Sequence, residues 1–137
     1  MYFWNPASAV AAAVQDGSRV LLIRRGIEPH LGSWALPAGY QEIDEDPRDT
    51  AKREVAEETG LQIEVLSLFD TVWVPDDPRK PANVLVYLCR PCGGTLCAGS
   101  DASEAAWFDL DDLPEDVGFD NRERILTRLP RPGGEGG

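Results

Sequence analysis

The chain has 137 residues, 42% of them hydrophobic, and its 24 acidic and 13 basic side chains give a net charge of −11. This length suits one domain with a real core, and so acidic a surface repels nucleic acid and argues against a nucleic-acid partner. No run of 18 apolar residues is present and the N-terminus lacks the pattern of a secretion signal, so we expect a cytoplasmic protein with no membrane partner.

Five runs of residues have the composition of β-strands. They lie at residues 7–14, 19–24, 62–74, 82–89 and 104–109. The first two are joined by Gln15-Asp16-Gly17-Ser18, which is a hairpin signal. A loop at residues 26–33 follows the second run, and Pro91-Cys92-Gly93-Gly94 predicts a turn after the fourth.

Two segments are predicted to be helical. The first begins at Pro47 after the N-cap Asp46 and stops before Gly60, a residue suited to the left-handed conformation past a helix end. The second is capped at Asp120-Asn121 and runs through Leu129, with an apolar stripe that includes Ile125. We therefore expect a single domain over residues 1–129, followed by a disordered Pro/Gly-rich tail at 130–137.

The first helix carries three glutamates on one face. At 100° per residue, Glu54, Glu57 and Glu58 fall within an arc of about 100°, whereas Ala51 and Val55 mark a face that can pack inward. Carboxylates held this close repel one another, and a hard divalent cation is the usual reason to keep them together. The alternative is a solvated helix with charge pairs along its surface.

The segment from Gly39 to Leu61 resembles the signature of the Nudix hydrolase family at every defined position. The matching residues are Gly39, Glu45, Arg53, Glu54, Val55, Glu57, Glu58, Gly60 and Leu61. Seven of these positions admit one residue type, each used at roughly 6%, so chance agreement in one register is on the order of 10⁻⁹. Asp44 departs from the glycine most often found before the first signature glutamate, which a surface loop should tolerate.

The resemblance implies an α/β fold, namely an α/β/α sandwich with a mixed β-sheet, over nearly the whole chain. Trp34-Ala35-Leu36-Pro37-Ala38 before Gly39, together with Asn5-Pro6 and Ile27-Glu28-Pro29, is similar to one branch of the family. That branch contains pyrophosphatases acting on ADP-ribose, NADH or FAD-type dinucleotides. Many of its members begin with a four-cysteine zinc ribbon, which this sequence lacks.

The implied reaction is hydrolysis of a nucleoside diphosphate linked to another moiety, with Mg²⁺ or Mn²⁺ as the cofactor. The implied metal ligands are Glu54, Glu57, Glu58 and the Gly39 carbonyl. Arg53 and Glu45 are expected to orient them, since arginine can hold a carboxylate through two hydrogen bonds. The general base is either Glu58 or Glu104, and Glu104 lies just before the last strand. The alternative for Glu104 is that it is one more solvated acid in an acidic loop.

Other candidate residues keep two interpretations each. Arg24, Arg25 and Tyr40 either contact the substrate or belong to the structure, and Tyr2, Phe3 and Trp4 either stack on a base or pack. Cys89-x-x-Cys92 and Cys97 have no second pair of ligands, so reduced structural thiols are favoured over a zinc site.

Three functions compete. The first is the dinucleotide pyrophosphohydrolase described above; the second is a nucleoside-triphosphate pyrophosphohydrolase of the sanitising kind; the third is a non-catalytic nucleotide-sensing module. A sensing module usually shows broken signature acids, which does not apply here. The expected partner is a small nucleotide substrate, and a homodimer is left open.

Overall fold

The computed structural model describes residues 7–26, 32–74, 82–99, 102–117 and 125–130. Its elements are β1 (Ala7–Asp16), β2 (Arg19–Arg25), β3 (Trp34–Ala35), β4 (Ala38–Tyr40), α1 (Pro47–Thr59), β5 (Leu61–Val74), β6 (Ala82–Gly94), β7 (Ala102–Asp109) and a 3₁₀-helix (Leu126–Arg128). All five predicted strands are confirmed, and β3 and β4 are two short strands that the sequence did not predict. Among the described residues, no helix has the length and apolar character needed to cross a membrane.

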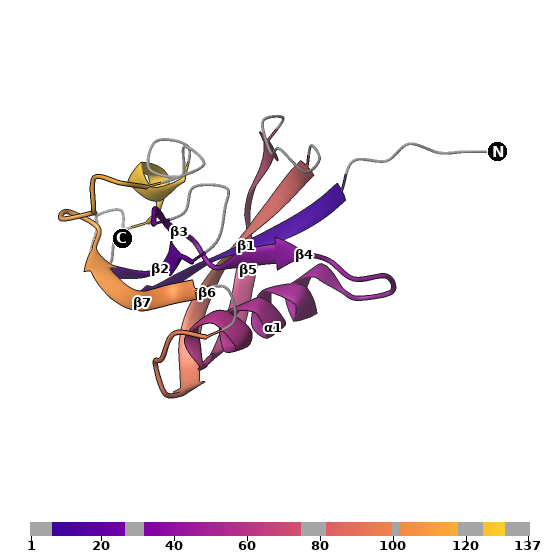
Figure 1. Ribbon diagram of the computed structural model, residues 1–137. Helices are drawn as coiled ribbons and strands as arrows, with labels where there is room; N and C mark the ends of the chain where they lie inside the picture. Colours follow the sequence, from indigo (N-terminus) through magenta and orange to yellow (C-terminus); the bar gives the residue numbers. More distant parts are fainter. Residues whose placement is uncertain (1–6, 27–31, 75–81, 100–101, 118–124, 131–137) are drawn as a thin grey trace.

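The strands form one mixed sheet in the order β3-β2-β1-β6-β5, with β4 on β1 and β7 on β2 (Figure 1). Among the strand pairs that the structure describes, only β1 and β6 run parallel, pairing from Ala7↔Ala82 to Val14↔Cys89. The predicted hairpin is present, since β1 and β2 pair antiparallel at Gln15↔Val20 next to the turn. The mixed sheet implied by the resemblance is therefore confirmed.

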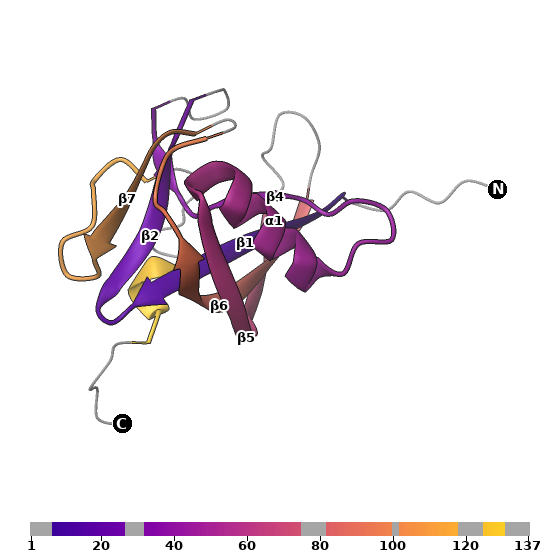
Figure 2. The same ribbon diagram turned by 90° about the horizontal axis from the view of Figure 1, so that it is seen from below.

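The central strand β1 supplies both cores of the molecule. Its residues alternate between the two faces, as the twofold period of a strand requires. Val10, Ala12 and Val14 pack in the cluster that contains the helix residues Ala51 and Val55. Ala11 and Ala13 pack in a second cluster, on the other face, that contains the 3₁₀-helix residue Leu126. Figure 2 shows α1 and the 3₁₀-helix on either side of the strands.

Helix α1 begins and ends where its sequence predicts. The Asp46 side chain accepts a hydrogen bond from Arg48 N at 2.8 Å, and Pro47 takes the first helical position. Gly60 ends the helix with φ of 74°, and its N–H donates to Ala56 O. Ala51 and Val55 are fully buried, as the spacing predicts. The glutamate face is therefore fixed relative to the sheet.

The turn predicted at residues 91–94 is wrong, because β6 continues through Gly94. Pro91 pairs with Ile63 and Gly94 with Leu61, so β5 and β6 extend together as a two-stranded ribbon. Proline is tolerated there because the pairing of β6 with β1 ends at Cys89. The register of β5 and β6 also shifts between Gln62 and Ile63, next to Pro91.

The predicted second helix is only partly within the described residues. Its predicted start at Asp120-Asn121 lies outside them, and its end is a 3₁₀-helix at Leu126–Arg128 instead of an α-helix. The predicted apolar stripe is nevertheless confirmed, since Ile125, Leu126 and Leu129 are all buried. Of the predicted tail, Pro130 is described and its carbonyl accepts a hydrogen bond from Gln15 Nε2 at 2.7 Å. Residues 131–137 lie outside the described part.

Asp44 explains the glycine preference at its position. Its φ is 65°, in the left-handed region, where glycine carries no steric cost. Aspartate is among the residues that tolerate this conformation best, and Asp44 is exposed. The loop before α1 therefore accommodates the departure from the family pattern.

Candidate active site

Helix α1 is fastened to strand β4 by the acidic side chains that the sequence singled out. The Glu58 side chain accepts a hydrogen bond from Ala38 N at 3.1 Å, and Glu58 is only 7% exposed. The Glu54 carboxylate lies against Gly39 so closely that a Cβ there would overlap it. Glycine at position 39 is therefore what allows the carboxylate of Glu54 to reach the strand.

Arg53 is the centre of a charged network at this junction. Its guanidinium contacts Glu45 at 2.9 and 3.0 Å, Glu54 at 2.7 Å, Glu57 at 3.5 Å and the Tyr40 carbonyl at 3.1 Å. The pair with Glu45 is bidentate, and Thr50, a fully buried residue, donates to the same carboxylate at 2.7 Å. The expectation that Arg53 and Glu45 orient the other glutamates agrees with this arrangement.

The network shifts the acidity of its members in opposite directions. Hydrogen bonds from Arg53, then from Thr50, lower the pKa of Glu45 to about 2. The same pairing with Glu45 raises the pKa of Arg53. Burial raises the pKa of Glu54, whose side chain is 14% exposed, and Arg53 opposes that rise. Glu45 therefore stays ionised well into acid, whereas Glu54 binds a proton more readily.

We predict that the Glu45 network loses its stabilising effect in acid. The folded pKa of about 2 lies below the ordinary 4.5, so this stabilisation is complete above about pH 4.5 and is lost as the pH falls toward 2. The stability difference between the wild type and Glu45→Gln should therefore be largest near neutral pH and should shrink below pH 4.5. Urea unfolding of both proteins in EDTA at several pH values measures it; a difference that grew toward acid would contradict the prediction.

The carboxylates have the chemistry of a divalent-cation site but are not arranged as one in this structure. Within the described residues, no three His, Cys, Asp or Glu side chains converge closely enough to hold a metal ion. Arg53 instead contacts both Glu54 and Glu57. All the donors are oxygens, the set that Mg²⁺ and Mn²⁺ prefer. Glu54 and Glu57 would have to leave Arg53 to bind a cation together with Glu58.

Glu104 begins the strand run predicted at 104–109, but β7 starts at Ala102, so Glu104 lies inside the strand and not just before it. It pairs with Arg24 across the sheet, and Arg24 Nη1 lies 2.9 Å from Glu104 Oε1. Arg24 also donates to Gly32 O at 2.9 Å and lies over the Trp34 ring at 5.9 Å. The structure thus brings two predicted site residues together, Arg24 and Glu104. Both are about half exposed.

The remaining candidates are placed less directly. Arg25 ends β2 beside a register shift, and Tyr40 ends β4 with its carbonyl bound to Arg53. Tyr2, Phe3 and Trp4 lie outside the described residues. Sequence reasoning missed the backbone donor of Ala38 and the hydroxyl of Thr50. The lead-in to Gly39 was a signal for Ala38, whereas a single threonine in a helix gives none.

The three cysteines are free thiols, as expected for reduced protein. Cys89 is buried, and burial raises its pKa to about 12, so it stays protonated. Cys92 and Cys97 are exposed. The described residues hold no cluster of these thiols suited to zinc.

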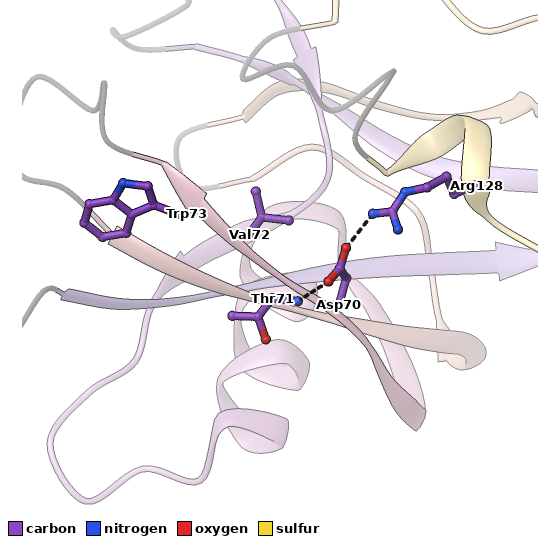
Figure 3. A pocket seen from close by; sticks show the side chains of 5 residues that line it. All are labelled: Asp70, Thr71, Val72, Trp73 and Arg128. Carbon is purple, nitrogen blue, oxygen red and sulfur yellow. Dashed lines mark hydrogen bonds and ion pairs between the residues drawn. The ribbon is translucent and has the colours of Figure 1, made fainter.

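A separate open cavity lies on β5 and the 3₁₀-helix (Figure 3). It measures about 480 Å³ and is lined by Asp70, Thr71, Val72, Trp73 and Arg128. Arg128 lies 2.6 Å from Asp70, and this hydrogen bond lowers the pKa of the aspartate. None of the predicted site residues lines this cavity.

Comparison with known proteins gives consistent matches. The family model described as "NUDIX domain" matches residues 5–129. An "ADP-ribose pyrophosphatase" of Methanocaldococcus jannaschii is 40% identical over 130 residues, which is 94% of this chain and 76% of the relative. The crystal structure of a "MutT NUDIX hydrolase" from Burkholderia pseudomallei has a TM-score of 0.83 at 28% identity, covering 93% and 100% of the two chains. The NUDIX domain of Shewanella oneidensis NrtR, solved with ADP ribose, has a TM-score of 0.64 at 28% identity over 80% and 76%.

Proposed function

The chain belongs to the Nudix hydrolase family, enzymes that act on phosphorus anhydrides, and we propose that its substrate is a dinucleotide-like pyrophosphate of the ADP-ribose, NADH or FAD type. The observation that carries the proposal is the junction of α1 with β4, where all the signature acids are present: Arg53 contacts Glu45, Glu54 and Glu57, and Glu58 accepts a hydrogen bond from Ala38 N. The 40% identity to a protein named for ADP-ribose cleavage supports the choice of substrate. Hydrolysis would yield two phosphomonoesters.

The proposed metal ligands are Glu54, Glu57, Glu58 and the carbonyl of Gly39. Nudix hydrolases generally need a divalent cation, and we propose Mg²⁺ or Mn²⁺ because every donor is a hard oxygen. Bound there, the cation would neutralise the charge on the pyrophosphate and lower the pKa of an attacking water. With the cation bound, Ala38 N would keep its hydrogen bond to Glu58, and Arg53 would keep its pair with Glu45. The Nη1 atom of Arg53 would lose its contacts with Glu54 and Glu57.

We propose Glu104 as the general base, with Glu58 as the alternative. A base must be ionised and must have an oxygen available to accept a proton. Glu58 is nearly buried and bound to Ala38, and as a metal ligand it would have little basicity left. Glu104 is 53% exposed in its side chain, and within the described residues Arg24 is the donor to just one of its oxygens.

Gly39→Ala should remove most activity while leaving the protein folded. The added Cβ would overlap the Glu54 carboxyl group, which is the end of a flexible side chain and can swing away. The cost should thus fall on the placement of a metal ligand, lowering kcat by about 10- to 100-fold. Gly93→Ala is the matched control, because its Cβ meets the end of the Gln62 side chain, away from the glutamates. Equal activity of the two variants would show that Gly39 has no part in placing Glu54.

A product assay tests the substrate class. The proposal expects ADP-ribose, NADH or FAD to be cleaved with higher kcat/KM than nucleoside triphosphates, and inorganic phosphate to appear only after a phosphatase is added. Release of pyrophosphate from triphosphates at a higher kcat/KM would favour the sanitising function instead. Both assays are run at the same Mg²⁺ concentration, because the charge of the substrate depends on its bound cation.

The proposed setting is the cytoplasm, where soluble nucleotides are available and thiols stay reduced. Sedimentation of the purified protein distinguishes a monomer from a homodimer. A dimer would place two copies of the site on one particle.

A further inference from the structure

The connection between β6 and β7 lies against the C-terminal end of α1. Cys97 N donates to Thr59 O at 2.9 Å, and Gly99 N donates to Glu58 O at 3.2 Å. The last carbonyls of a helix have no partner within the helix, so this segment satisfies two of them. The two carbonyls that this segment contacts belong to Glu58 and to Thr59, the next residue.

Gly99 approaches the helix more closely than another residue could. A Cβ at this position would lie 2.6 Å from Glu57 O, a backbone atom of α1 that cannot move without the helix. Gly60 and Gly94 make similar close backbone contacts nearby. Gly60 belongs to the family signature, whereas Gly99 lies outside it. Gly99 therefore meets the carbonyl groups of two signature glutamates, Glu57 and Glu58.

Gly99 also bonds to the first residue of β7. Its carbonyl accepts a hydrogen bond from Ala102 N at 3.1 Å, while its own N–H is bound to Glu58 O. Two hydrogen bonds on one residue thus join the helix of the glutamates to the strand of Glu104, which lies two residues beyond Ala102. On the other side, Arg24 of β2 holds the Glu104 carboxylate at 2.9 Å.

We propose that Gly99 is a positioning residue for the hydrolysis, and that it fixes Glu104 relative to Glu57 and Glu58. This inference rests on the proposed function, in which Glu104 is the base and the α1 glutamates hold the cation. A shift of about 1 Å between groups that react together can lower the rate about 100-fold. The close contact at Gly99 sets the distance between β7 and α1, so a side chain there moves one element from the other.

The test is Gly99→Ala, measured at saturating substrate and Mg²⁺ well below its melting temperature. We expect kcat to fall about 10- to 100-fold while KM changes little. Gly93→Ala, in β6 just before this connection, should keep the wild-type kcat. A purely structural role of Gly99 would lower the melting temperature but leave kcat per folded molecule unchanged, and that result would overturn the proposal.

A double-variant cycle shows whether Gly99 acts through Glu104. Adding Gly99→Ala to Glu104→Gln should cause little further loss, because the group that Gly99 positions is already inactive. If the fold-losses in kcat of the two single variants multiply in the double variant, Gly99 does not act through Glu104. That result would overturn the inference even if Glu104 is the base. A wild-type kcat in Glu104→Gln alone would show instead that the proposed base is wrong, and the positioning role would fall with it.

A second variant covers the case in which Gly99→Ala does not fold. Ala102→Pro removes the N–H that binds Gly99 O and adds nothing at α1, and proline is tolerated at the first residue of a strand. It should lower kcat in the wild-type background and add little to Glu104→Gln. A wild-type kcat in Ala102→Pro would contradict the proposed link between Gly99 and β7.

Discussion

Replacing Glu58 or Glu57 with glutamine is expected to remove most of the activity, with kcat lowered by at least about 100-fold. Each substitution removes a charged ligand and leaves a side chain of the same shape, and loss of groups that merely support ligands already costs about 10- to 100-fold. For Glu58 the amide can still accept the hydrogen bond from Ala38 N, so the junction with β4 should persist. Steady-state kinetics across a Mg²⁺ titration measure the loss.

Asp49→Asn is the matched control for these two variants. Asp49 lies in the first turn of the same helix and is exposed, and it is not one of the carboxylates that Arg53 contacts. Its kcat should stay within about twofold of the wild type, with stability within about 0.5 kcal/mol. A wild-type rate in both glutamine variants, or full turnover in EDTA, would show that α1 is not the metal site.

Glu104→Gln is expected to lower kcat by about 10²–10⁴ with little change in KM, because the amide cannot take the proton of the attacking water. Glu104 is about half exposed and paired with Arg24 at the surface, so stability should change by no more than about 0.5 kcal/mol. Glu115→Gln, an exposed acid elsewhere, is the control and should keep the wild-type kcat.

A metal titration separates the three roles open to Glu104. As the base, its loss should not be recovered by any concentration of Mn²⁺. If Glu104 supports an outer metal ion, added Mn²⁺ should restore much of the rate. If it is a surface acid, kcat should stay within about twofold, and the base role would return to Glu58.

The helix was the most predictable part of the molecule. Its cap, its proline and its terminal glycine are local signals, and each acts on the residues next to it. The spacing of Ala51 and Val55 correctly predicted the buried face, because helical geometry does not depend on the rest of the chain. The same geometry predicted Glu54, Glu57 and Glu58 on one face, and the structure adds that Glu54 and Glu58 meet β4.

The features that were missed depend on contacts between distant segments. The sequence around Pro91 predicts a turn, but Pro91 pairs with Ile63 and belongs to a strand. Strands β3 and β4 are too short to show an alternating pattern. The partner of Glu104 is Arg24, 80 residues earlier, and only the register of β2 and β7 reveals it. The role of Gly99 likewise follows from its distance to the α1 backbone.

The most direct test of the account is the equilibrium binding of Mn²⁺ to the folded protein, measured from the free-ion signal in electron paramagnetic resonance. The wild type and Asp49→Asn should bind the ion. Saturation at 100 times Kd should raise the free energy of unfolding by about 2.7 kcal/mol. A double Glu57→Gln, Glu58→Gln variant should remain folded and bind at least about 100-fold more weakly. Equal Mn²⁺ binding by the double variant and the wild type would contradict the assignment of the cation to α1.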